Sequence, residues 1–243
     1  MAVWHRAQHT LAGRPAVATA SDSKPIGILR YFGDPMCSWC WGFKPVLEQV
    51  DREYPELRRI TVMGGLRGES DKPMSDELMK LVQAAWLRIE QTTGQPFNHE
   101  LWRRHRPLAT TLPACRAVLA ARLQDPEREW AFMVGMFQAY FTRALDPTRR
   151  ETYLDVAVRT GFGLPDFEAK LDSPDVEHAL QQDLQLTRQF GISGFPSVVL
   201  SLENDHYLVS PGYQKIEGMR RAINAAYEEA GVEFVRPESG LYS

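Results

Sequence analysis

The chain has 243 residues, of which 44% are hydrophobic and 24% are charged, the composition of an ordinary globular protein with a sizeable core. Its net charge of -3 gives no electrostatic reason to expect nucleic acid or an anionic membrane as a partner. No apolar run approaches the roughly 20 residues that span a bilayer. Three cysteines are too few for a disulfide scaffold.

Residues 1–25 are expected to form a flexible N-terminal tail. The tract Ala-Val-Ala-Thr-Ala at 16–20 could pass for a cleavage site, but polar residues and Pro15 interrupt the apolar segment that a secretory signal needs. We therefore expect a cytoplasmic location, with a periplasmic one as the alternative.

The first half of the chain predicts a parallel crossover unit. Residues 26–32 and 59–63 are short, mostly apolar runs that indicate buried strands. Between them, from Trp41 onward, hydrophobic residues recur at helical spacing, although Pro45 predicts a kink or a late restart. Strand, helix and strand at this spacing predict a right-handed parallel unit.

A long helical region follows, and then the β pattern returns. Helices are expected to begin near six positions, namely Ser75, Leu112, Asp125, Tyr153, Pro165 and Ser173, and the last of these helices to end near Phe190. Residues 196–202 and 207–209 predict a hairpin, and residues 214–231 predict a terminal helix.

The stretch from Asp34 to Phe43, Asp-Pro-Met-Cys-Ser-Trp-Cys-Trp-Gly-Phe, joins the first predicted strand to the first predicted helix. A Cys-x-x-Cys pair at this place in a β-α-β unit is typical of thioredoxin-like redox sites. The unpaired N–H groups at a helix N-terminus favour the thiolate of Cys37, and the thiolate is the nucleophile. Cys40, one turn deeper, is the expected resolving thiol.

This order of elements, with Gly-Phe-Pro-Ser at 194–197, resembles the DsbA-like family, closest to its FrnE-like and disulfide-isomerase members. The resemblance implies an α/β protein, a thioredoxin-like fold with a large inserted α-helical domain. It implies a discontinuous thioredoxin-like domain at residues 26–70 and 188–235, and a helical domain at residues 71–187.

The resemblance also implies further site residues. The bond before Pro196 would be cis and would lie against the cysteine pair, and the preceding backbone would pair with an extended substrate. Phe195 would shape substrate access or be buried beneath the loop, and Trp39 would contact substrate. Ser38 and Trp39, between the cysteines, would tune the reduction potential.

The sequence departs from the related proteins in two ways. DsbA-type oxidants carry a histidine between the cysteines, which Ser38-Trp39 lacks, so Cys37 should be a less extreme thiol. Thioredoxin carries a buried acid six residues before its first cysteine, where this chain has Tyr31. Water or another group must then move the proton of Cys40, and Asp34 is a candidate, with a turn or cap role as the alternative.

The expected function is that of a thiol–disulfide oxidoreductase or isomerase acting on dithiols or disulfides of proteins or small molecules. No metal or organic cofactor is expected, although glutathione could serve as reductant. A zinc site would need Cys115 and a histidine such as His105 in an unusual arrangement, and Cys115 is expected to be a buried small hydrophobe.

Two alternatives remain open. One is a glutathione-dependent isomerase or transferase of the 2-hydroxychromene-2-carboxylate isomerase and kappa-class transferase type, which typically carries serine where Cys37 stands. The other is a non-catalytic binding or chaperone module. The oligomeric state is left open.

Overall fold

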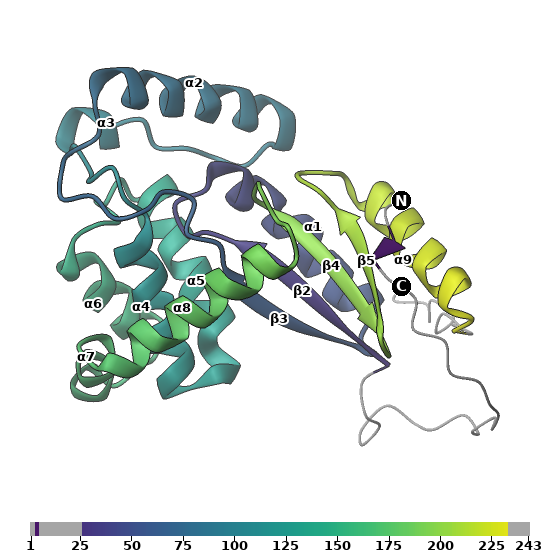
Figure 1. The fold of residues 1–243 in the computed structure, drawn as a ribbon. Coiled ribbons are helices and arrows are strands. Elements are labelled where there is room, and N and C mark those ends of the chain that lie inside the picture. The colour runs from purple at the N-terminus through teal and green to yellow at the C-terminus, as the bar shows by residue number, and fades with distance from the viewer. Residues whose placement is uncertain (1–2, 5–25, 233–243) are drawn as a thin grey trace, which may run out of the picture.

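A mixed sheet of five strands lies at the centre of the computed structural model, which describes residues 3–4 and 26–232 (Figure 1). The strands are β1 (Val3–Trp4), β2 (Gly27–Gly33), β3 (Leu57–Met63), β4 (Ser197–Leu202) and β5 (Asp205–Ser210). Their order is β1-β5-β4-β2-β3, with β2 parallel to β3 and antiparallel to β4. The predicted crossover unit and hairpin are both present.

Part of the segment that was expected to be a flexible tail, residues 1–25, forms strand β1 instead. Val3 and Trp4 belong to the segment expected to be a flexible tail, yet they pair antiparallel with Tyr207 and His206 of β5. An outer strand offers unpaired N–H and C=O groups, and even a two-residue segment can satisfy some of them. Residues 1–2, 5–25 and 233–243, including the end of the expected second thioredoxin-like segment, lie outside the described residues.

Helices cover both faces of the sheet. The longer helices are α1 (Ser38–Glu53), α2 (Asp76–Thr93), α4 (Leu112–Gln124), α5 (Glu129–Phe137), α6 (Arg150–Arg159), α7 (Leu164–Leu171), α8 (Pro174–Gln189) and α9 (Ile216–Ala230). Shorter segments are α3 (Leu101–Arg104), a 3-10 turn (Pro126–Arg128) and a π-helical turn (Gln138–Thr142). Helices α1 and α9 pack on one face, and α8 packs on the other beside β3 (Figure 1).

The chain between β3 and β4 holds seven of these helices, α2 to α8, which lie mostly to one side of the sheet (Figure 1). The fold is therefore thioredoxin-like with a large helical insertion, as the sequence predicts. The main core runs continuously from the sheet and α1 into the insertion, so the two parts share one hydrophobic interior.

Local sequence explains the ends of the elements that carry the site. Helix α1 runs past Pro45 without the predicted restart. Helix α2 begins where the Ser75 hydroxyl accepts a hydrogen bond from the amide of Leu78, and it ends at Gly94, which has a left-handed conformation with φ of 72°. All six residues of β4 are buried, as expected for a central strand.

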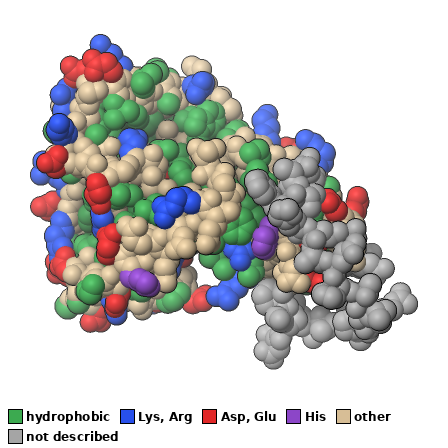
Figure 2. All heavy atoms as spheres, viewed as in Figure 1, with side chains coloured by type: hydrophobic (Ala, Val, Ile, Leu, Met, Phe, Trp, Pro, Cys, Tyr) green, Lys and Arg blue, Asp and Glu red, His purple; other side chains and the backbone are tan. Residues whose placement is uncertain are grey.

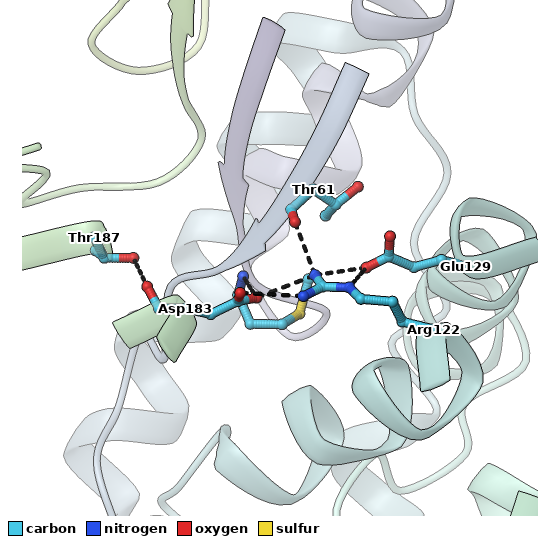
Figure 3. A network of polar contacts seen from close by, with 6 residues as sticks. Thr61, Arg122, Glu129, Asp183 and Thr187 are labelled. Carbon is cyan, nitrogen blue, oxygen red and sulfur yellow. Dashed lines mark hydrogen bonds and ion pairs between the residues drawn. The ribbon is translucent and has the colours of Figure 1, made fainter. Parts of the chain in front are cut away.

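A largely buried ionic network joins the insertion to the sheet (Figure 3). Arg122 of α4 donates to Asp183 of α8 and to the carbonyl of Thr61 in β3, and it also pairs with Glu129 of α5. Asp183 in turn accepts the amide of Met63 at 2.7 Å. The network therefore holds three helices of the insertion against the end of β3.

Candidate active site

The two cysteines lie at the N-terminus of α1. Cys37 precedes the first helical residue, with an extended backbone, and its amide donates to the carbonyl of Asp34 at 3.0 Å. Its own carbonyl accepts the amide of Trp41 at 3.1 Å, the first bond of the helix. Cys40 follows one turn later, and both side chains are thiols in this structure. The helix N-terminus thus points its partial positive charge at Cys37.

The two thiols differ in burial. Cys37 keeps 5% of its surface exposed, whereas Cys40 is fully buried. Burial raises the pKa of the Cys40 thiol well above its ordinary value, and the neighbouring Cys37 raises it further. The nearby hydroxyl of Tyr31 and the backbone of Asp34 act on this pKa in the opposite direction. Cys37 is therefore the more exposed of the two cysteines, although only a small part of its surface is accessible to solvent.

The loop before β4 closes over Cys37. The Phe195–Pro196 peptide bond is cis, and the carbonyl of Phe195 accepts a hydrogen bond of 3.5 Å from Cys37 Sγ. The Phe195 ring is half-buried and lies against Gly64, where a Cβ atom would come within 2.1 Å of it. Two segments far apart in the sequence therefore meet at the sulfur of Cys37.

Asp34 is fully buried and anchors the segment that leads to Cys37. Its carboxylate accepts hydrogen bonds from the amides of Met36 and Leu66, both at 2.8 Å, and from the Thr111 hydroxyl at 2.6 Å. The thiol of Cys115 lies 3.6 Å from the same carboxylate. Burial raises the pKa of Asp34, while these donors lower it. The contacts fit the turn role that the sequence left as an alternative.

Trp39 forms the rim of the site. Its half-buried ring packs against Tyr213 with ring centroids 5.3 Å apart, and the guanidinium of Arg88 in α2 lies 5.6 Å from the ring centroid. Arg88 also lines a shallow pocket of about 220 Å³ on α2 together with Leu81, Ala84 and Ala85. Ser38 beside Trp39 is half-buried. The rim therefore continues from α1 onto the inserted helical region.

The structure brings together most of the side chains that the sequence singled out. Cys37, Cys40, Asp34 and the Phe195–Pro196 loop meet at one end of the sheet, and Trp39 stands at the edge. The sequence analysis missed Thr111, Arg88 and Tyr213. Each lies far along the chain from the cysteines, and no local spacing signals its contact.

Among the described residues, the structure shows neither a cluster of metal-ligating side chains nor a helix that could span a membrane. Across residues 3–4 and 26–232, no three His, Cys, Asp or Glu side chains gather closely enough to bind a metal. Every helix in those ranges is too short or too polar to cross a bilayer. On the face in Figure 2, basic and acidic side chains alternate along the outer edge of the helical insertion, so neither sign dominates there.

Comparisons with known proteins agree with this architecture. A model of the thioredoxin family matches residues 31–219. Among solved structures, a candidate protein disulfide isomerase from Nitrosomonas europaea is 31% identical, with a TM-score of 0.76 over 84% of this chain and 98% of its own. The cytosolic disulfide reductase DsbM from Pseudomonas aeruginosa is 24% identical, with a TM-score of 0.70 over 83% and 99%, a likeness of fold.

Curated relatives carry a different description. The ClpXP adapter protein SpxH from Halalkalibacterium halodurans is 28% identical over 189 residues, which are 74% of this chain and 60% of that protein. The SpxH of Bacillus subtilis is 26% identical over 194 residues, 78% of this chain and 63% of that protein. The chain thus spans about three fifths of the length of the curated relatives that it matches.

Proposed function

The chain belongs to the thioredoxin family, with the helical insertion of its DsbA-like members, and we propose that it is a thiol–disulfide oxidoreductase working through Cys37 and Cys40. The observation that carries the proposal is the placement of Cys37. It lies at a helix N-terminus, contacts the Phe195–Pro196 loop and has a buried cysteine one turn behind it. Fixed dipoles at such a place stabilise a thiolate, and a second thiol in reach allows a ring disulfide to close.

The mechanism follows from the different exposure of the two sulfurs. In the reductive direction, the Cys37 thiolate attacks a substrate disulfide, forms a mixed disulfide and releases one substrate thiol. Cys40 then attacks Cys37 Sγ, which breaks the mixed disulfide and releases the second thiol. In the oxidative direction, a substrate thiolate attacks Cys37 Sγ of the Cys37–Cys40 disulfide, and a second substrate thiol resolves the complex. The two electrons move between sulfurs, so no metal or organic cofactor takes part.

The substrate would meet the backbone before Pro196 and the ring of Trp39. An extended peptide can pair with the backbone of such a loop by β-addition, and Phe195 would then border the bound segment. Dithiols or disulfides of proteins, or of small molecules, fit this geometry, and an isomerase activity is one use of it. Glutathione is the proposed reductant, which is supported by a structure of DsbM with GSH bound.

We place the protein in the cytoplasm, with the periplasm as the alternative. DsbM is described as cytosolic. Thiol pools are kept reduced in that compartment, so net reduction or isomerisation is favoured there over net oxidation.

An adapter role is the second candidate, and it rests on the description of the SpxH relatives as ClpXP adapter proteins. Such a role would use the surface of the protein and need no exchange at the cysteines. A glutathione-dependent isomerase or transferase acting on small molecules is a further alternative, and the presence of both cysteines argues against it.

The proposal is tested by the redox equilibrium of the Cys37–Cys40 pair in glutathione buffers, measured by thiol alkylation and mass spectrometry. A potential near about -270 mV would indicate a reductant, and one between about -120 and -200 mV an oxidant or isomerase. Cys115→Ala is the matched control, because it removes the third thiol and leaves the pair intact. Failure to form the disulfide at any ratio of reduced to oxidised glutathione would refute the proposal.

A double variant, Cys37→Ser with Cys40→Ser, separates the two candidates. It abolishes disulfide exchange under the main proposal. If the protein promotes degradation of a ClpXP substrate in a purified system, and the double variant does so equally well, the adapter role holds independently of redox chemistry.

A further inference from the structure

Tyr31 is held rigidly behind the cysteine pair. It lies in β2, is fully buried, and its ring stacks on Phe43 at 6.4 Å and meets the edge of Trp130 at 5.8 Å between centroids. The end of the ring lies over Gly33, where a Cβ atom would come within 2.7 Å of the hydroxyl oxygen. The ring therefore has little freedom to turn, and the glycine two residues on makes room for it.

The hydroxyl of Tyr31 is buried without a hydrogen bond of ordinary geometry to any described residue. The polar group that it faces is the thiol of Cys40, which is also fully buried. Buried polar groups are nearly always paired in native proteins, so an unpaired donor beside a thiol requires a reason. A neutral thiol is a weak acceptor, whereas a thiolate is a strong one.

The charges around this pair decide which way the hydrogen bond runs. Burial raises the pKa of Tyr31 well above its ordinary value, and Cys40 and Cys37 raise it further, while Arg59 of β3 lowers it. Arg59 is itself paired with Asp51 of α1 at 3.0 Å. A Cys40 thiolate has no proton to give, so a hydrogen bond between the two groups can only run from the phenol to the sulfur.

We propose that Tyr31 donates a hydrogen bond to the Cys40 sulfur as that thiol loses its proton, and so promotes the step in which Cys40 resolves a mixed disulfide. In that step Cys40 Sγ bonds to Cys37 Sγ, the bond from Cys37 to the substrate sulfur breaks, and the proton from Cys40 ends on the departing substrate thiol. Tyr31 gives up no proton and no electron. The inference rests on the proposed function and assigns a residue to its second step.

The test uses the reduced full-length protein and Ellman's reagent, 5,5′-dithiobis(2-nitrobenzoate), in a stopped-flow spectrometer. Attack by Cys37 releases a first equivalent of the yellow thiolate, and resolution by Cys40 releases a second. For Tyr31→Phe we expect an unchanged first phase and a second phase slower by about tenfold, the effect of one hydrogen bond to a charged group. The pH midpoint of the second phase should rise by about one unit, because the same bond favours the thiolate.

Tyr140→Phe is the matched control, because Tyr140 is another buried tyrosine whose hydroxyl has no hydrogen-bond partner among the described residues. It should leave both phases unchanged. The assignment would be overturned if both variants slowed the second phase equally. It would also be overturned if the second phase of Tyr31→Phe kept the wild-type rate and pH midpoint. In either case the proposed function would stand. A wild-type protein that releases no second equivalent would overturn both.

If Tyr31→Phe does not fold, Gly33→Ala serves in its place. This variant keeps the phenol but introduces a methyl group against it, so the hydroxyl is displaced from Cys40. The same slowing of the second phase alone is expected, and wild-type kinetics with wild-type pH dependence would again contradict the assignment.

Discussion

The carboxylate of Asp34, three residues before Cys37, accepts a hydrogen bond of 2.6 Å from the hydroxyl of Thr111 at the start of α4. This bond joins the cysteine segment of the thioredoxin-like part to the inserted helices. Because the other two short contacts of Asp34 come from the amides of Met36 and Leu66, the same carboxylate fixes three segments of backbone at the site. The insertion therefore helps to position the loop of the candidate active site.

Asp34→Asn should destabilise the protein more than Thr111→Val. Asparagine replaces one accepting oxygen by a donor, so at least one buried N–H or O–H loses its partner, at a cost of about 1–3 kcal/mol for each such group. Thr111→Val leaves Asp34 with both amides, and it takes the hydroxyl acceptor only from the partly buried amide of Arg67, at 3.2 Å. Urea denaturation of the reduced proteins measures the difference. Thr160→Val is the control, since that hydroxyl bonds within its own helix, and a larger loss for Thr111→Val than for Asp34→Asn would contradict the argument.

Gly64 should tolerate a side chain only when Phe195 is removed. A Cβ at position 64 would lie 2.1 Å from the Phe195 ring, so Gly64→Ala must displace that ring and the loop whose carbonyl contacts Cys37. We expect Gly64→Ala to cost about 1–3 kcal/mol in the wild-type background and much less in Phe195→Ala. A double-mutant cycle by urea denaturation measures the coupling. Equal costs in both backgrounds would show that the two residues do not conflict.

The sequence predicted the positions of the strands and helices more completely than the side-chain contacts between them. Strands β2, β3, β4 and β5 begin and end within about three residues of the predicted positions, because short apolar runs bounded by Gly, Pro and Asp carry their own signal. The four-residue helix α3 was missed because it is too short for a helical repeat to show. The resemblance, rather than any local pattern, indicated that Pro196 would lie near Cys37.

The contacts that complete the site could not be predicted in this way. Thr111 reaches Asp34 and Tyr213 reaches Trp39 only after the insertion and the C-terminal elements have packed. Such pairs are set by tertiary structure, and a single sequence gives no signal that joins them. Tyr31 was noted as the replacement for an acid, but its orientation toward Cys40 required the structure.

The network around Arg122 should contribute far more to stability than an exposed network of similar composition. Burial lowers the pKa of Arg122, but Glu129 and Asp183 more than offset this, and the pKa is raised overall. Arg122→Met would leave both carboxylates without their cation in a buried place, at a cost of about 3–5 kcal/mol. The measurement is the free energy of unfolding in urea.

Arg150 supplies the control for this prediction. It pairs with Asp172 and Glu168, but all three side chains are more than 40% exposed, so water screens the charges. Arg150→Met should therefore cost less than about 1 kcal/mol. Comparable losses for the two arginine variants would contradict a special role for the buried network.

Cys115 should make the stability of the reduced protein depend on pH in the alkaline range. Burial, and then the charge of Asp34, raise the pKa of the Cys115 thiol well above its ordinary value. In the unfolded chain the same thiol ionises at its ordinary pKa, near about 8.5. Above that pH the unfolded state binds fewer protons than the folded state, so the free energy of unfolding falls as the pH rises. The slope from this one group approaches about 1.4 kcal/mol per pH unit.

Cys115→Ala removes this contribution while the other two thiols, Cys37 and Cys40, and the buried tyrosines remain. At pH 7 the variant should be less stable than wild type by about 1 kcal/mol, because a small buried side chain is lost. Between pH 8.5 and 10 the wild-type protein should lose stability more steeply, so the difference between the two proteins shrinks and then reverses. Urea denaturation under reducing conditions across this range measures both slopes. Parallel curves would mean that Cys115 ionises as readily in the folded protein as in the unfolded chain, which its contact with the buried Asp34 carboxylate argues against.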